Sequence, residues 1–174
     1  MMKVLLPFQA MNQYADQVPA SYRASACGPI TAASILRYHK ELTPGIGQLY
    51  RFLGTTSLGL SAFCFIRQLR KWLGPRYEIK RVRSIGQVKQ ELDAGNPLAV
   101  KFDRYFSLRW RQQTTFAYHW VPLIGYEETE DDLLLYVHDN GQKNRPSNLR
   151  AVSFRKNRSV LSFIRISPVQ RSNE

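Results

Sequence analysis

The chain has 174 residues, of which 44% are apolar, so it is long enough to bury one core without disulfide or metal staples. No run comes near the roughly twenty apolar residues of a transmembrane helix, so we expect no membrane span. Lys and Arg outnumber Asp and Glu by 25 to 13, a net charge of +12 that favours either a solvated basic surface or an anionic partner. We expect one domain over residues 1–174.

The first part of the chain is predicted to be helical. Residues 30–39 are rich in Ala and Ile and have little polar surface, which indicates a helix buried on several sides. Residues 43–53 open with Thr-Pro, the pattern of an N-cap followed by proline in the first turn, and predict a short helix. Residues 61–73 form an amphipathic helix that starts at Ser and stops before Gly-Pro.

The middle of the chain predicts a strand at 77–82, where apolar and charged residues alternate. Ser84 and Gln87 form a capping box for a helix that ends at residues 93–95. Residues 97–102 predict a further strand. The segment 104–116 is aromatic and basic without clear periodicity, which indicates a loop near the functional face.

The last part of the chain predicts mostly strands. Residues 118–126 and 133–137 are two apolar β segments separated by an acidic turn at 127–132. Further strands are expected at 151–154 and 160–166. Because helices come first and most of the sheet last, the order of elements predicts an α+β fold.

Cys27 stands at the front of the first predicted helix, in the sequence Ala26-Cys27-Gly28-Pro29. The unpaired N–H groups of a helix N-terminus favour a thiolate over a thiol, and a Gly at the next position allows a close approach to the sulfur. A free cysteine is more often a packing residue. We interpret Cys64, beside the apolar stripe of residues 61–73, in that way, and we predict that Cys27 is the reactive one.

His119 and Asp139 are expected to lie near each other, because the strands that carry them pair across the acidic turn. A carboxylate bound to one imidazole nitrogen leaves the other nitrogen free to take the proton of a thiol. Such a site also needs a donor to the oxyanion that forms during attack. The backbone N–H of Cys27 and the side-chain amide of Gln13 or Gln17 are the candidates.

These motifs resemble, in type and in order, the papain-like cysteine peptidases of the bacteriocin-processing, double-glycine type, and in particular their stand-alone bacterial relatives. The resemblance covers about residues 7–166. It is carried by the sequences Asn12-Gln13-Tyr14, Ala26-Cys27-Gly28-Pro29-Ile30-Thr31-Ala32-Ala33 and Gly95-Asn96-Pro97, by His119 with Val121-Pro122-Leu123-Ile124-Gly125-Tyr126 after it, and by Asp139.

The resemblance implies a papain-like fold, with the nucleophile at a helix N-terminus packed on an antiparallel sheet. It implies a peptidase that cleaves peptide or protein substrates through a thioester, without a cofactor. Cys27 would be the nucleophile, His119 the general base and then acid, Asp139 the residue that orients the imidazole, and Gln13 the oxyanion donor.

The chain departs from the family pattern in ways that leave alternatives open. Asn140 follows Asp139 where the family often has proline, so either residue could orient the imidazole, although Asn140 is by default a turn residue. Gln13 is far from Cys27 in sequence, which leaves Gln17 open as the donor. No transporter segment is fused, so export of a bacteriocin is not implied. A thiol acyltransferase or amidase would use the same residues, and a non-catalytic basic binding module is a further alternative.

We predict no metal site, because no His, Cys or carboxylate cluster has metal-ligand spacing. We do not expect nucleic acid as a partner, because the basic residues are not accompanied by a basic amphipathic helix or a nucleic-acid motif, while an acidic partner for the basic surface stays open. The N-terminus shows no signal sequence, which favours the cytoplasm, with secretion after signal removal as the alternative.

Overall fold

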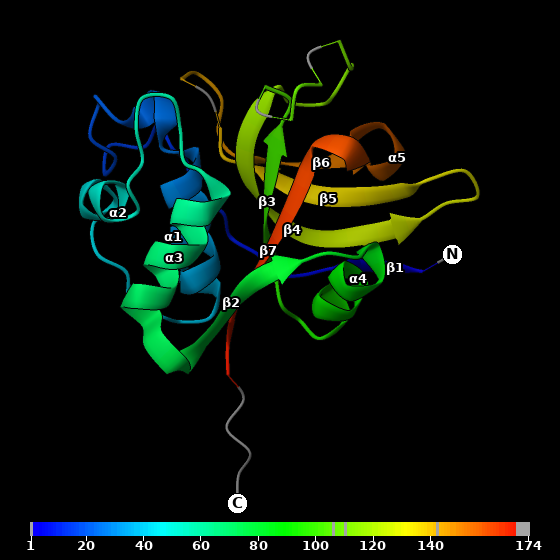
Figure 1. The fold of residues 1–174 in the computed structure, drawn as a ribbon, viewed down its shortest axis with the longest axis horizontal. Helices are drawn as coiled ribbons and strands as arrows, with labels where there is room; N and C mark the ends of the chain where they lie inside the picture. The colour runs from blue at the N-terminus through cyan, green and yellow to red at the C-terminus, as the bar shows by residue number, and fades with distance from the viewer. Residues whose placement is uncertain (1, 106, 110, 142, 170–174) are drawn as a thin grey trace, which may run out of the picture.

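In the computed structural model, which describes residues 2–105, 107–109, 111–141 and 143–169, the helices between residues 27 and 73 gather on one side of the molecule, and the strands lie on the other together with the later helices (Figure 1). The helices are α1 (Cys27–Tyr38), α2 (Ile46–Phe52), α3 (Ala62–Leu73), α4 (Ile85–Asp93) and the short α5 (Phe154–Asn157). The strands are β1 (Lys3–Leu5), β2 (Tyr77–Val82), β3 (Leu98–Asp103), β4 (Tyr118–Glu128), β5 (Leu133–Asp139), β6 (Asn148–Ser153) and β7 (Leu161–Pro168).

The strands form one seven-stranded sheet in the order β2-β7-β3-β4-β5-β6, and β1 pairs with the far part of β4. Every pairing between these strands is antiparallel. The prediction of an α+β fold is therefore confirmed. β4 is the longest strand, and it pairs with β3 and β1 on one side and with β5 on the other.

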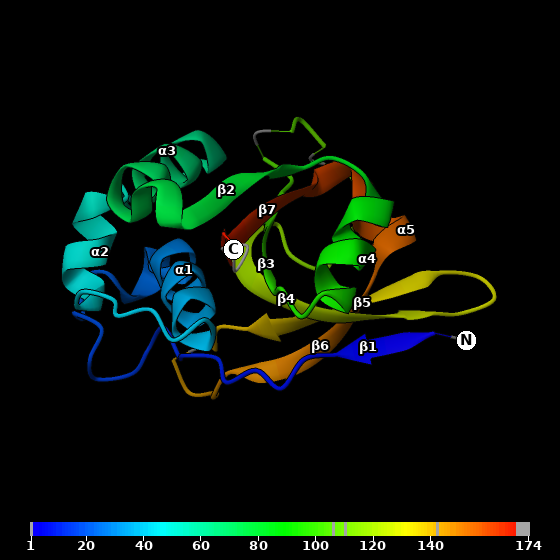
Figure 2. The same ribbon diagram turned by 90° about the horizontal axis from the view of Figure 1, so that it is seen from below.

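The sheet separates two hydrophobic cores, because neighbouring residues of a strand point to opposite faces. Trp120 belongs to the core under α1, α2 and α3, whereas Val121 belongs to the core under α4. Figure 2 shows the curved sheet, with α1, α2 and α3 on one side and α4 on the other. All residues of α1 from Cys27 to Leu36 are buried, as the Ala-rich run predicts.

Of the three helix N-caps predicted from the sequence, at Thr43, Ser61 and Ser84, the structure confirms the last two. Ser61 Oγ accepts a hydrogen bond from the backbone N–H of Cys64, and Ser84 Oγ accepts one from Gln87, so both predicted N-caps are confirmed. The predicted cap at Thr43 is wrong, because α2 begins only at Ile46 and no side chain caps it. The extended backbone of Gly45 delays the start of this helix.

Two elements are absent from the predictions made from the sequence. β1 is only three residues long, and short strands carry too little alternation to be recognised. Residues 151–154 were expected to be a strand, but Phe154 instead begins α5, whose N-cap is Ser153. Ser153 Oγ accepts a hydrogen bond from the backbone N–H of Lys156, and this cap ends the strand one residue early.

Within the residues described, no helix combines the length and the apolar character that crossing a membrane requires.

Candidate active site

Cys27 is the first residue of α1, and only 5% of its surface is exposed. No side chain caps this end of the helix, so the partial positive charge of its first N–H groups acts near the thiol. A Cβ atom on Gly28 would lie 2.8 Å from Leu60 Cδ2, which means that only glycine lets this side chain pack so closely on the first turn.

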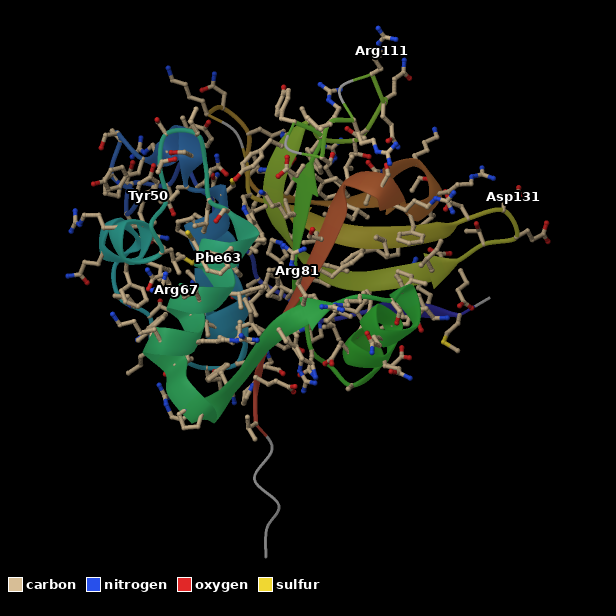
Figure 3. The ribbon with its side chains drawn as sticks, in the orientation of Figure 1. Tyr50, Phe63, Arg67, Arg81, Arg111 and Asp131 are labelled. Carbon is tan, nitrogen blue, oxygen red and sulfur yellow. The ribbon has the colours of Figure 1, made fainter. Side chains whose placement is uncertain are left out.

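His119 and Asp139 are brought together by the antiparallel pairing of β4 and β5, as predicted. His119 Nε2 lies 3.2 Å from Asp139 Oδ1. The His119 side chain is 14% exposed and that of Asp139 is 3% exposed, so water competes little for this contact. The acidic turn that joins the strands lies at their far end, where Asp131 is exposed at the tip (Figure 3). A buried carboxylate can thus fix the tautomer and orientation of the imidazole.

Two arginines hold the second oxygen of the Asp139 carboxylate. Arg145 Nη2 donates to Asp139 Oδ2 at 2.7 Å, and Arg150 Nη1 donates to the same atom at 3.3 Å. Burial alone would favour the neutral acid, but the hydrogen bonds and positive charges of His119, Arg150 and Arg145 hold the pKa of Asp139 below its ordinary value. The carboxyl group is therefore ionised at neutral pH.

The pKa of His119 is shifted in the direction that a paired imidazolium requires. Burial lowers it, but hydrogen bonds and charge interactions with Asp139 and Cys27 outweigh this effect and raise the pKa of His119 to about 9. Cys27 is thus one of the two groups that hold the pKa of the imidazole above its ordinary value. A thiol and an imidazole placed in this way are the pair that nucleophilic catalysis by cysteine needs.

Gln13 lies at this site and Gln17 does not. Gln13 lines a cavity of about 240 Å³ together with Tyr118, His119 and Asp139, and it is 5% exposed. Its side-chain Nε2 donates one hydrogen bond to the carbonyl oxygen of Arg23 at 3.0 Å, which leaves the second N–H of the amide for another acceptor. Gln17 is exposed and does not line this cavity. Gln13, and not Gln17, thus lines the same cavity as His119 and Asp139.

Asn140 is completely buried and directly follows the last residue of β5. Its side-chain Nδ2 faces three acceptors: the carbonyl oxygen of Trp120 at 2.8 Å, and the carbonyl oxygen of Cys27 and the hydroxyl of Thr31, both at 3.1 Å. The backbone carbonyl oxygen of Asn140 accepts a hydrogen bond from the backbone N–H of Gln13 at 2.9 Å. Asn140 therefore links the segments that carry Cys27, His119 and Gln13.

The loop that follows Asn140 is fitted tightly against the Gln13 segment. Gly141 has a φ of +87°, and a Cβ atom there would lie 2.7 Å from Asn12 Oδ1. The same Asn12 oxygen accepts a hydrogen bond from the backbone N–H of Tyr14 at 2.8 Å, which fixes the turn around Gln13. Only glycine fits this contact without strain.

Asn140→Ala should lower the free energy of unfolding by about 2–3 kcal/mol, because it removes the donor that satisfies buried backbone carbonyls of two different elements. Urea unfolding followed by circular dichroism measures this loss. Asn148→Ala is the matched control, since Asn148 is exposed at the start of β6 and should change stability little. Equal stability of both variants would contradict the linking role of Asn140.

Tyr118 connects this site with a second cavity of about 480 Å³, which Leu58, Leu60 and Cys64 also line. The Tyr118 hydroxyl accepts a hydrogen bond from the backbone N–H of Leu60 at 2.8 Å and donates to the Leu60 carbonyl oxygen at 2.9 Å. Burial, together with negative charge at Cys27, raises the pKa of Tyr118 to about 12, so it remains neutral. Cys64 is half-buried and packs beside the helical core, as expected from its position.

The sequence did not point to Arg145, Arg150 or Phe116. The Arg150 guanidinium lies 4.8 Å from the centre of the Phe116 ring, and this ring lies 4.9 Å from the ring of His119. These residues thus cover one side of the imidazole. Arg145 stands in the loop after β5, Arg150 in β6 and Phe116 in the irregular segment before β4, and no spacing rule in the sequence indicates that these three side chains turn toward one site. As for metals, the described residues contain no group of three or more His, Cys, Asp or Glu side chains arranged to hold an ion.

Comparison with known proteins adds independent information on the family. A family model described as the Peptidase_C39 like family matches residues 5–169. A comparison with curated proteins gave no match.

Three solved structures are similar to the chain, each at 16% sequence identity. A structure described as a C39-like peptidase from Bacillus anthracis has a TM-score of 0.65 and covers 99% of this chain and 100% of its own. The peptidase domain of Streptococcus ComA, a bifunctional ABC transporter involved in quorum sensing, has a TM-score of 0.61, with 93% and 99% covered. A double glycine motif protease from an AMS/PCAT transporter, solved with a leader peptide, has a TM-score of 0.53, with 97% and 100% covered.

The resemblance inferred from the motifs is thus confirmed at the level of family and fold. Since the family model spans nearly all of the sequence and the solved structures share its architecture, the chain belongs to the Peptidase_C39 like family and has a papain-like α+β fold.

Proposed function

We propose that this protein is a cysteine peptidase that cleaves peptide bonds through Cys27, His119 and Asp139. The observation that carries the proposal is the contact of 3.2 Å between His119 Nε2 and Asp139 Oδ1, beside a thiol at a helix N-terminus. Family membership supports the same chemistry. A nucleophile, a base and an orienting carboxylate in this order are what acyl transfer through a thioester requires.

The reaction proceeds in two steps in this proposal. The Cys27 thiolate attacks the carbonyl carbon of the peptide bond, and the carbonyl oxygen takes the negative charge. The protonated His119 gives its proton to the leaving amine, and the acyl group stays on sulfur as a thioester. Water then attacks the thioester while His119 takes a proton from it, and the acid product leaves with the thiolate restored. Asp139 remains ionised and stabilises the imidazolium.

The backbone N–H of Cys27 and the second side-chain N–H of Gln13 supply the hydrogen bonds to the oxyanion. The first points outward from a helix terminus, where it has no intrahelical acceptor. The second belongs to a buried amide that a hydrogen bond to Arg23 keeps in place. Donors held in position before the reaction stabilise charge that develops only in the transition state.

Peptides are the substrate class that we propose. The support is the structural neighbour, a double glycine motif protease solved in complex with a leader peptide. In the present chain, the cavity of about 480 Å³ has mostly apolar walls and shares Tyr118 with the smaller cavity at His119. An extended peptide could place a side chain there while its backbone crosses Cys27.

Incubation with a proteome-derived peptide mixture, followed by mass spectrometry, tests the proposal. We expect new peptide termini that appear with the wild-type protein and are absent with Cys27→Ala. Termini that appear equally with both proteins, or no cleavage by a folded wild-type protein across the mixture, would argue against peptidase activity.

Gln13→Ala should lower kcat by about a hundred- to a thousand-fold and change KM little, because the oxyanion exists only in the transition state. Gln17→Ala is the matched control and should keep nearly full turnover, since Gln17 is exposed away from the cavity. Steady-state kinetics on a peptide identified above measures both. Near-normal turnover of Gln13→Ala beside a crippled Gln17→Ala would move the donor to Gln17.

A further inference from the structure

A second concave site lies away from Cys27, at one end of the core under α4. It is a groove of about 430 Å³, and we call it the arginine groove because Arg81, Arg83 and Arg158 line it. Its apolar walls include Ile85 and Phe154. It shares no lining residue with the cavity at His119, so an inference drawn from it does not depend on the proposed peptidase activity.

The framework of the arginine groove consists of regular elements. Val82 at the end of β2 pairs with Phe163 of β7, and both line the groove. Ile85 is the first residue of α4, and Phe154 is the first residue of α5. Because strands and capped helix ends hold these positions, the groove is formed before any ligand arrives.

The positive charge of the arginine groove has no neutralising carboxylate among the residues that the structure describes. In the part of the chain that the structure describes, Arg81, Arg83 and Arg158 form no ion pair, and no acidic residue lines the groove. The nearby carboxylate of Glu78, in contrast, is paired with Lys80 and Arg165. Concave walls of one charge sign concentrate the local potential and attract an anionic ligand.

The chemistry of the walls defines what this ligand must offer. Guanidinium groups bind carboxylates in a bidentate manner, so the rim favours acidic side chains. Ile85, Phe154 and Leu161 are only half-buried, and covering them requires apolar side chains. A nucleic acid would satisfy the guanidinium groups, but it would set polar sugars and phosphates against these apolar walls. A lipid bilayer presents a flat surface that does not enter a groove.

We propose that the arginine groove binds an acidic segment of a partner polypeptide in which carboxylates alternate with apolar side chains. The guanidinium groups bind the carboxylates, and the apolar side chains cover the half-buried walls. This assigns part of the +12 net charge to a defined binding surface.

Fluorescence anisotropy with a labelled synthetic peptide of Asp-Leu-Glu-Phe repeats tests the proposal. The full chain carries Cys27→Ala, so that the probe cannot be cut. We expect saturable binding that weakens as KCl is raised, because salt screens exposed charges. Replacing Leu and Phe of the probe by Ser should weaken binding about tenfold, because the apolar walls then lose their cover.

The double variant Arg81→Ala/Arg158→Ala should weaken binding about tenfold or more, since it removes two charge-assisted contacts. The matched control is Arg51→Ala/Arg67→Ala, which removes the same charge from exposed positions on α2 and α3. Figure 3 shows Arg67 on the helical side and Arg81 near the middle of the molecule. The control variant should bind as the parent does. Circular dichroism confirms that both variants fold.

Several outcomes would overturn the proposal. Equal weakening in the two double variants would mean that the probe senses only net charge. Equal binding of the Ser-substituted probe would mean that the apolar walls are not used. Tighter binding of a single-stranded oligonucleotide or of anionic phosphatidylserine vesicles, lost in Arg81→Ala/Arg158→Ala, would assign the groove to another class of ligand. Absence of saturable peptide binding at low salt would remove the site altogether.

Discussion

Cys27→Ala should lower peptide turnover by about a millionfold, to the background of the assay. The expected loss is this large because a nucleophile and its base act as one unit, so removing the sulfur removes the covalent route completely. Cys27 is the residue at the N-terminus of α1 that interacts with His119. Initial rates on a fluorogenic peptide, chosen from the cleavage sites found with the wild-type protein, measure the change.

Cys64→Ala is the matched control for this variant. Cys64 is half-buried beside the helical core and forms part of the wall of the larger cavity. We expect turnover within a few-fold of wild type, with any change in KM rather than kcat, because Cys64 has no imidazole partner to activate it. Loss of turnover in Cys64→Ala beside an active Cys27→Ala would reverse the assignment of the two thiols.

Asp139→Asn should lower kcat by about ten thousand-fold while the protein stays folded. An amide has nearly the same shape as the carboxylate, but it carries no charge to stabilise an imidazolium and can hold the wrong tautomer. The substitution also leaves Arg145 and Arg150 without the carboxylate that they share. The effect is therefore electrostatic and orientational, and circular dichroism should show little change.

The pH dependence of kcat/KM in Asp139→Asn gives a second measure of the effect of Asp139 on His119. The pKa of His119 is about 9 because interactions with Asp139 and Cys27 overcome the effect of burial. The protonated imidazole that donates to the leaving amine is thus kept below about pH 9 and lost above it, so kcat/KM of the wild type should fall on the alkaline side near pH 9. Loss of the Asp139 charge favours the neutral imidazole and should move this limb to lower pH.

Asp131→Asn is the control for charge alone, because Asp131 is exposed at the turn between β4 and β5. It should leave both kcat and the alkaline limb unchanged. An Asp139→Asn variant with the wild-type pH profile would show that Asp139 does not orient His119.

The parts of the site that the sequence could predict are those that local patterns encode. The position of Cys27 follows from a helix start, which Ala-rich composition and Gly-Pro indicate. The approach of His119 to Asp139 follows from two alternating apolar segments and one short turn, because antiparallel pairing brings their outer ends together. Both inferences need only neighbouring residues and the geometry of one hairpin.

The roles of Asn140, Arg145 and Arg150 in the site could not be predicted, because they depend on contacts between segments that are distant in sequence. Nothing around Asn140 distinguishes a turn residue from a buried one, and its hydrogen bonds to Cys27 and Trp120 join residues far apart in sequence. The Arg145 contact depends on how the loop after β5 folds back onto Asp139, and the Arg150 contact depends on the pairing of β5 with β6. An irregular loop has no repeating pattern from which the orientation of its side chains can be predicted, so only the tertiary structure reveals which charged side chains turn inward.

The most direct test of the central claim, that His119 activates the Cys27 thiol, is limited alkylation with iodoacetamide at neutral pH, read by peptide mass mapping. We predict that Cys27 is labelled ahead of Cys64, despite being only 5% exposed, and that His119→Ala abolishes this preference, because the imidazolium that stabilises the thiolate is then absent. Preferential labelling of Cys64 in the wild-type protein, or unchanged labelling of Cys27 in His119→Ala, would contradict the account.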